Sequence, residues 1–259
     1  MKKESIHIVK IGSAIVDEND VLEEFLSDFT ALESPKILIH GGGKSASKLA
    51  KELNIPVKMH KGRRITCNKT LDVITMTYAG KINKNLVAKL QLFGCNALGL
   101  SGADGDVIRA KKRSPNPIDF GHVGDVTSVN ANLIATLLNA GIIPVFCAMT
   151  HDMNGNLLNT NADTIASEIA IALSSDFETK LYYAFDQPGV MRDLNDKTSL
   201  INEITSDSYE ELKNKRVISD GMIPKLDNCM HALDHGVEKI YIGDQKLLKP
   251  NSKSFTLIH

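Results

Sequence analysis

Three consecutive glycines, Gly41, Gly42 and Gly43, end the short apolar run 36–40 and precede a helical pattern. Glycine has no Cβ atom, so the backbone N–H groups of such a turn can come close to a bound group. The start of the following helix adds partial positive charge at the same place. The pattern therefore predicts a site for an anionic ligand, with a phosphate as the first candidate.

Two known glycine motifs fit these residues less well than a phosphate-binding turn. A Walker A loop needs a glycine five positions before Gly43, where Leu38 stands. A dinucleotide fingerprint fits Gly41, Gly43 and Ala46, but the acidic ribose ligand expected about 20 residues later is replaced by the basic run 61–64. A purely structural tight turn is the second interpretation.

Two lysines stand where lysine is unusual. Lys10 lies inside an apolar strand pattern, between Val9 and Ile11, and the turn Gly12-Ser13 follows directly. An ammonium group is costly to bury without an anionic partner, so we favour a functional lysine over one whose side chain reaches solvent. The segment 220–225 brings a second lysine, Lys225, to another glycine turn.

Polar clusters elsewhere suit carboxylate binding, and each has a simpler explanation. Arg64, in the segment 62–66, could hold a carboxylate in a bidentate manner, or could lie on a solvated edge. Asn161 and Asp163, shortly after Asn159, precede an apolar helix and could only cap it. For His122, in the segment 121–124, a hairpin end is the favoured interpretation.

Composition excludes several classes of protein. The chain has 259 residues and a formal net charge of -1, without the basic excess of a general nucleic-acid binder. Its four cysteines are scattered and form no C-x-x-C pair, which argues against a zinc site or a disulfide framework. No run approaches the roughly 18 apolar residues of a membrane span. We expect a cytoplasmic protein.

Short apolar runs alternate with helical patterns along the chain, which predicts an α/β fold with a mainly parallel sheet. A helix is expected over 161–173, a β-hairpin or lid over 103–125, and a boundary between two lobes at 174–176. Ligands of such sheets bind beyond the carboxyl ends of the strands. The expected strands are 6–11, 36–39, 97–100, 142–146, 180–185 and 239–242.

Six motifs, taken in order, resemble those of the N-acetylglutamate kinases of the amino acid kinase superfamily. The resemblance implies a three-layer αβα fold with two lobes: residues 1–175 bind the acylated glutamate and dimerise, and residues 176–259 bind ATP. It also implies ATP-dependent phosphorylation of a γ-carboxylate, the second step of arginine biosynthesis. The motifs are Lys10-x-Gly12, His40 to Gly43, Gly62-x-Arg64-Ile-Thr66, Gly121 to Gly124, Asn159-x-Asn161-Ala-Asp163 and Ser219 to Lys225.

The resemblance also implies roles for single residues. Lys10 and Lys225 would neutralise charge on the transferring phosphoryl group, Asp163 would orient both lysines, and Mg²⁺ would bridge the phosphates of ATP. A carboxylate acceptor is ionised at neutral pH, so positioning replaces a general base. The other implied contacts are the amides of Gly42, Gly43 and Gly12 or Ser13 for the γ-phosphoryl oxygens, Arg64, Asn159 and Asn161 for the substrate, and Asp186 and Gly189 for the nucleotide.

Two departures from the family pattern concern the nucleotide side. Ser13 stands where the family usually has glycine, and Ala184-Phe185 precedes Asp186 where Leu-Thr or Leu-Ser is usual. Kinases of glutamate, aspartate, carbamate or a nucleoside monophosphate, and a non-catalytic metabolite sensor, are the alternatives. The acyl group, acetyl or succinyl, stays open.

The resemblance further implies a homodimer formed through the N-terminal lobe. Arginine-inhibited members of the family carry an additional helix ahead of the first strand, and here only residues 1–5 precede Ile6. A helix that short is marginal. We therefore expect a two-fold symmetric homodimer with little or no inhibition by arginine.

Overall fold

The computed structural model describes residues 3–33, 35–193, 195–196, 198–215, 217–218 and 222–259. The chain divides into two compact units, residues 1–36 with 166–259 and residues 37–165. The boundary expected between residues 175 and 176 concerns which ligand each lobe binds, and it stays a prediction.

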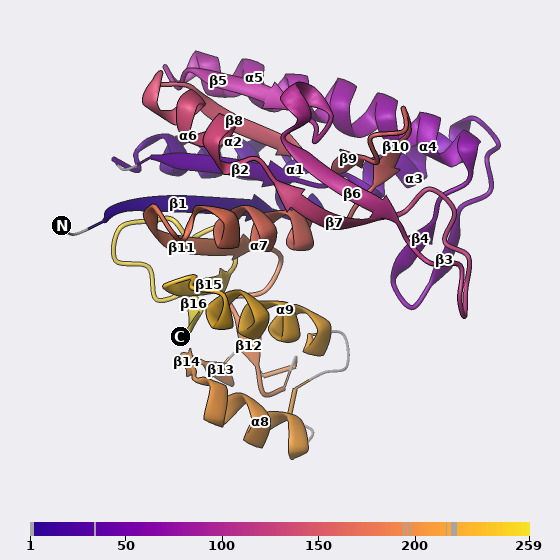
Figure 1. Ribbon diagram of the computed structural model, residues 1–259. Coiled ribbons are helices and arrows are strands. Elements are labelled where there is room, and N and C mark those ends of the chain that lie inside the picture. The colour runs from indigo at the N-terminus through magenta and orange to yellow at the C-terminus, as the bar shows by residue number, and fades with distance from the viewer. Residues whose placement is uncertain (1–2, 34, 194, 197, 216, 219–221) are drawn as a thin grey trace. The chain divides into compact units, whose positions relative to one another are not determined.

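The first unit is built on five strands in the order β14-β16-β15-β11-β1 (Figure 1). β15 and β16 are antiparallel, and the other neighbours in this sheet run parallel. β12 and β13 form a separate antiparallel pair. Its strands are β1 (Glu4–Ile11), β11 (Phe177–Ala184), β12 (Val190–Met191), β13 (Leu200–Ile201), β14 (Glu203–Ile204), β15 (Lys239–Gly243) and β16 (Phe255–Ile258). Its helices are α1 (Ser13–Val16), α2 (Asn19–Thr30), α8 (Ser206–Asn214), α9 (Ile223–Asp234) and most of α7 (Ala162–Leu173).

The second unit contains three parallel strands in the order β2-β8-β5 and a smaller sheet in the order β10-β9-β6-β7. Its strands are β2 (Lys36–His40), β3 (Lys58–His60), β4 (Arg63–Ile65), β5 (Ala97–Leu100), β6 (Ile108–Lys112), β7 (Gly124–Val129), β8 (Ile143–Cys147), β9 (Met149–His151) and β10 (Leu157–Asn159). Its helices are α3 (Gly43–Glu52), α4 (Asn68–Thr75), the π-helix η1 (Met76–Ile82), α5 (Asn83–Leu92), the 3₁₀-helix η2 (Asp104–Asp106) and α6 (Ala131–Asn139).

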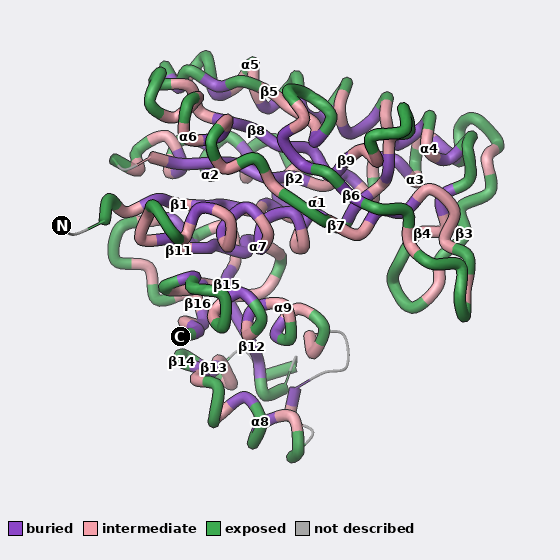
Figure 2. The backbone as a smooth tube through the Cα atoms, in the orientation of Figure 1, coloured by how far each residue is buried: buried purple, intermediate pink, exposed green. Residues whose placement is uncertain are grey.

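Burial explains why these segments form strands and helices. All five residues of β2 are buried, as are four consecutive residues at the end of β11, which is the pattern of parallel strands covered on both faces (Figure 2). In α7, Ile165, Ile169 and Leu173 follow the helical period and are fully buried. The predicted mixed α/β fold, the helix over 161–173 and the antiparallel hairpin formed by β6 and β7 are confirmed.

The helical segment 68–92 changes its winding at η1. Thr75 and Thr77 donate their hydroxyl hydrogens to the carbonyls of Leu71 and Val73, at 2.9 and 2.7 Å. Such bonds to the carbonyl four residues back often bend helices. π-helical turns are rare and often lie at functional sites. Here the wide turn directs Tyr78, Ile82 and Asn83 toward the end of β2.

Candidate active site

The glycine turn after β2 is packed against η1. Gly42 precedes the first residue of α3, and its carbonyl accepts the Ala46 N–H at 2.9 Å. A Cβ atom on Gly42 would lie 2.5 Å from Cδ1 of Ile82 and 2.7 Å from Cδ1 of Tyr78. Only glycine fits this space, and the turn places the Gly42 and Gly43 amides at a helix N-terminus, where an anion is favoured.

Arg64 is attached to the same turn. Its Nη2 donates to the Gly43 carbonyl at 2.9 Å and to Ser47 Oγ at 2.8 Å. Burial raises the pKa of the Tyr78 hydroxyl above its ordinary value, although the positive charge of Arg64 acts in the opposite direction. The structure therefore brings together the arginine and the glycines that the sequence singles out. Binding of a carboxylate by Arg64 stays a prediction.

Thr66 joins Asn159 to the segment that carries Arg64. Its side chain is fully buried, and its Oγ1 accepts a hydrogen bond from Asn159 Nδ2 at 3.0 Å. The Thr66 carbonyl accepts the His122 N–H at 2.7 Å, and the His122 carbonyl accepts the Asn159 N–H at 2.9 Å. Gly121 has φ +70°, and a Cβ there would collide with the Thr66 carbonyl. The motif 121–124 thus has a structural cause, which agrees with a hairpin end.

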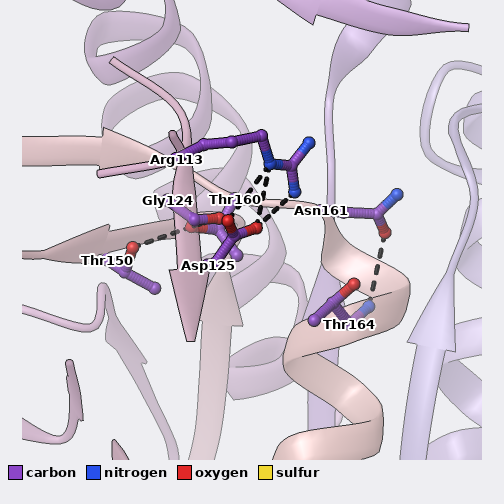
Figure 3. A network of polar contacts seen from close by, with 7 residues as sticks. All are labelled: Arg113, Gly124, Asp125, Thr150, Thr160, Asn161 and Thr164. Carbon is purple, nitrogen blue, oxygen red and sulfur yellow. Dashed lines mark hydrogen bonds and ion pairs between the residues drawn. The ribbon is translucent and has the colours of Figure 1, made fainter. Parts of the chain in front are cut away.

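Asn161 caps α7, as the simpler interpretation of its position predicts. Its Oδ1 accepts the N–H group of Asp163 at 2.7 Å. It also accepts the N–H group of Thr164 at 3.3 Å (Figure 3). The substrate contact expected for Asn161 stays a prediction, as does the orienting role of Asp163, which is half-buried in the first turn of α7.

A buried polar network holds together the strands behind Asn159. Thr150 and Thr160 share a hydrogen bond of 2.7 Å between their hydroxyl oxygens, and Thr160 also donates to the Gly124 carbonyl at 3.4 Å (Figure 3). Arg113 pairs with Asp125 in the same view. These bonds link β7, β9 and the end of β10, so the position of Asn159 depends on the small sheet as a whole.

In the first unit, Lys10 and Lys225 are both neighbours of Tyr183. Lys10 of β1 is the register partner of Tyr183 of β11, so both side chains leave the same face of the sheet. Lys225 Nζ lies 4.9 Å from the ring centre of Tyr183 and 5.7 Å from that of Phe185. Aromatic faces attract cations at these distances. The Tyr183 hydroxyl is itself within 2.6 Å of Ser167 Oγ.

The turn after β1 is fixed by the backbone. The Gly12 N–H donates to the Ala184 carbonyl at 2.9 Å, which continues the ladder between β1 and β11. A Cβ on Gly12 would lie 3.2 Å from that same oxygen. The Gly12 amide hydrogen is therefore used within the sheet, whereas Ser13 is the first residue of α1.

The other nucleotide-side residues have different surroundings. Asp186 is exposed directly after β11. Gly189 has φ +154°, and a Cβ there would lie 2.6 Å from Thr256 Oγ1, so packing on β16 accounts for this glycine. Their contacts with a nucleotide stay predictions. Ser219, Asp220 and Gly221, the first part of the sixth motif, lie outside the described residues.

Sequence reasoning missed several residues that build the turn, namely Ser47, Thr66 as a bonding partner, Tyr78 and Asn83. Their only signal in the sequence is that Thr66 belongs to the motif around Arg64. The others lie on helices, and helical periodicity predicts which face of a helix is buried but not which residues a side chain contacts.

Comparison with known proteins agrees with this geometry. A profile described as "Amino acid kinase family" matches residues 5–244. The chain is 50% identical over 240 residues to an acetylglutamate kinase of Phocaeicola vulgatus, covering 93% of each chain. It is 49% identical over 249 residues to the acetylglutamate kinase of Bacteroides thetaiotaomicron, covering 96% of this chain and 97% of that one. A crystal structure from Streptococcus mutans, 29% identical, superposes with a TM-score of 0.80 over 98% of both chains.

The chain therefore belongs to the amino acid kinase family, whose profile spans both of its compact units. Both curated relatives described above are named acetylglutamate kinase. The chain is about 50% identical to each of them over more than nine-tenths of its length.

Proposed function

We propose that this chain transfers the γ-phosphoryl group of ATP to the γ-carboxylate of an N-acylated glutamate, N-acetyl-L-glutamate in the first place, in arginine biosynthesis. The observation that carries the proposal is the bond from Arg64 Nη2 to the carbonyl of Gly43, in the turn that places its amides at the N-terminus of α3. One guanidinium group and one amide turn can hold the two carboxylates of a glutamate together. The relatives named acetylglutamate kinase support the same substrate.

The lysines of the first unit would lower the energy of the transition state. A carboxylate nucleophile is already ionised, so the reaction needs alignment and charge neutralisation rather than a base. Lys10 and Lys225 would supply that positive charge, with Asp163 as the residue that orients them. The aromatic rings of Tyr183 and Phe185 restrict the Lys225 ammonium group. Asp186 and Gly189 would contact the nucleotide.

Backbone amides complete the proposed site. Because the Gly12 N–H is bonded to Ala184, we assign the phosphoryl contact of this turn to the amide of Ser13. The amides of Gly42 and Gly43 are the other proposed phosphoryl contacts. Asn159 and Asn161 would bind the substrate amide and carboxylate.

Mg²⁺ fits this arrangement as an ion carried by the nucleotide. It prefers oxygen ligands and is often bound through substrate phosphates. In the part of the chain that the structure describes, three or more metal-ligating residues of the His, Cys, Asp and Glu types do not gather at one place. Bound Mg²⁺ would neutralise phosphate charge, and the protein residues would position the reacting groups.

The test is an ATP-dependent assay in which hydroxylamine traps the acyl phosphate, with acetylglutamate, succinylglutamate, glutamate and aspartate as acceptors. We expect turnover with acylated glutamate and little with the free amino acids. Turnover of glutamate or aspartate alone would move the chain to another kinase of the family. No turnover of any acceptor would support the non-catalytic alternative.

We also propose a cytoplasmic homodimer formed through surfaces of the N-terminal lobe, residues 1–175. Among the described residues of 37–165, seven large apolar side chains are exposed, and three of them lie on η1, α5 and β5, namely Met76 at 52%, Leu92 at 81% and Leu98 at 40%. Among the described residues, no helix is both long and apolar enough to cross a bilayer. Light scattering during size-exclusion chromatography would test the dimer, since a monomer or a hexamer would contradict it.

A further inference from the structure

The buried end of β2 carries a histidine that has no part in the proposed chemistry. His40 is 0% exposed, and both of its ring nitrogens have partners. Nδ1 lies 2.8 Å from the carbonyl oxygen of Gly41, and Nε2 lies 3.1 Å from Nδ2 of Asn83. A fully buried imidazole that precedes an anion-binding turn calls for an explanation of its own.

The partners fix which nitrogen carries the hydrogen. A carbonyl oxygen can only accept, so Nδ1 donates to Gly41. Burial lowers the pKa of His40 to about 4, so the ring is neutral at pH 7 and Nε2 holds a lone pair. Asn83 Nδ2 therefore donates to Nε2, and its second hydrogen goes to the Val145 carbonyl at 2.9 Å. Every hydrogen of this network has an acceptor.

The carbonyl that His40 holds belongs to the peptide whose nitrogen is Gly42. In a planar trans peptide the C=O and the following N–H point in opposite directions. The bond to His40 turns the Gly41 oxygen toward the ring, and the Gly42 N–H must then point away from it. The ring thus orients an amide that the proposed reaction uses.

The partners of Asn83 hold the ring in place. Asn83 is 1% exposed and is the first residue after η1, the same π-helix that packs Tyr78 and Ile82 against Gly42. A Cβ on Gly99 of β5 would collide with Asn83 Oδ1, so the neighbouring strand leaves room for this amide. Residues of η1, α5 and β5 therefore fix Asn83, and Asn83 in turn holds the imidazole ring of His40.

We infer that His40 is a positioning residue, which sets the direction of the Gly42 N–H through its bond to the Gly41 carbonyl and which is held in turn by Asn83. The inference rests on the proposed function, in which the Gly42 N–H donates to an oxygen of the phosphoryl group. It adds a residue that acts on the reaction without touching substrate.

Two amide substitutions separate the two bonds of the ring. In His40→Asn the side-chain nitrogen can take the place of Nδ1 and keep the donor to Gly41. In His40→Gln the amide can reach the place of Nε2 and keep the contact with Asn83, but the donor to Gly41 is lost. We expect His40→Gln to lower kcat by about tenfold to a hundredfold. We expect His40→Asn to lose no more than about fivefold, the cost of one imperfect neutral hydrogen bond.

Substrate affinity and the amide itself supply independent readouts. The KM for acetylglutamate should stay within about twofold in both variants, because Arg64 is untouched. In NMR spectra of ¹⁵N-glycine-labelled protein, inorganic phosphate should shift the Gly42 amide in the wild type and in His40→Asn, but not in His40→Gln. If His40→Gln does not fold, the same readouts apply to Asn83→Ala, with an expected loss of about threefold to tenfold in kcat.

Equal kcat values for the Asn and Gln variants, or a wild-type Gly42 amide that phosphate does not shift, would overturn the inference. So would an Asn83→Ala variant with unchanged kcat. A wild-type protein without activity on acylated glutamate would instead refute the proposed function. The phosphate titration would then still decide the role of His40, because it does not depend on turnover.

Discussion

The turns that follow β1 and β2 are positioned by different interactions. Both present backbone amides after a parallel strand. The turn at Gly12 is positioned by the main chain alone, through the bond of its N–H to the Ala184 carbonyl. The turn at Gly42 is positioned by side chains, with His40 on one side and Tyr78 and Ile82 on the other. We therefore expect a turn held by a main-chain bond to tolerate Ser13 in place of glycine, and a turn held by side chains to depend on each of them.

Substitution of the lysines of the first unit should have the largest effect on kcat, and it tests the role of their positive charge. Lys10→Ala and Lys225→Ala should each lower kcat by on the order of 10²-fold or more, because each removes a preorganised positive charge from the transition state. The KM for acetylglutamate should change far less. Lys180→Ala, which removes a lysine of β11 near Glu178, is the matched control. Near-wild-type kcat in either variant would refute the assignment.

Gly42→Ala tests the turn held by side chains. The new Cβ would meet Tyr78 and Ile82, so the turn must move. We expect a loss of about 1–3 kcal/mol in the free energy of unfolding, as for other overpacked sites, and a fall in kcat of at least about tenfold. Gly41→Ala is the comparison, because its Cβ would lie 3.8 Å from the Cβ of Ala162, an ordinary contact. Thermal denaturation and initial rates measure both. Equal effects at the two positions would contradict the packing explanation.

Arg64→Lys separates binding from chemistry in the second unit. Lysine keeps the charge but cannot form a planar, bidentate contact with a carboxylate. The KM for acetylglutamate should rise by about tenfold, with kcat much closer to the wild-type value and ATP affinity barely changed. Steady-state kinetics with each substrate varied in turn would show this. Weaker ATP binding alone would place Arg64 at the nucleotide and leave Arg63 as the carboxylate candidate.

Ser13→Gly should have the smallest effect. It restores the glycine that the family usually carries, at a position whose neighbour Gly12 is fixed through Ala184. If the amide of Ser13 is the contact, kcat should change by no more than about threefold, because an N–H is present in both forms. A large gain in kcat would show that the Ser13 side chain hinders the phosphoryl group. Initial rates at saturating ATP decide this.

Much of the architecture follows from local patterns in the sequence. Apolar runs mark the parallel strands, and the period of Ile165, Ile169 and Leu173 marks α7. Motifs in the sequence single out the site residues, and Gly12 and Gly42 follow the parallel strands β1 and β2, at the edge of the sheet where ligands bind. What joins these residues could not be predicted in the same way. Thr66 and Asn159 are 93 positions apart, and Asn83 lies 43 positions after His40. Without an alignment, a single sequence carries no signal for such pairs.

The π-helix escaped prediction for a related reason. Its side chains are apolar on one face, as in an α-helix, and only the hydrogen-bonding pattern differs. Thr75 and Thr77 stand at its start, but threonine occurs in ordinary helices as well. The residue types of this segment therefore say nothing about the winding of the helix.

The winding of η1 determines which way the side chains of the following helix, α5, point, including that of Asn83 beside the glycine turn. An α-helix turns by about 100° per residue. Since i→i+5 bonding fits more residues into a turn than i→i+4 bonding, an ordinary α-helix over 76–82 without loss of a residue would rotate α5 by about that angle. Asn83 would leave His40, and Leu86 and Leu90 would leave the core together with it. The number of residues in this helix therefore matters to the glycine turn as much as their identity, and evolution can alter the residues of its outer face far more easily than its length.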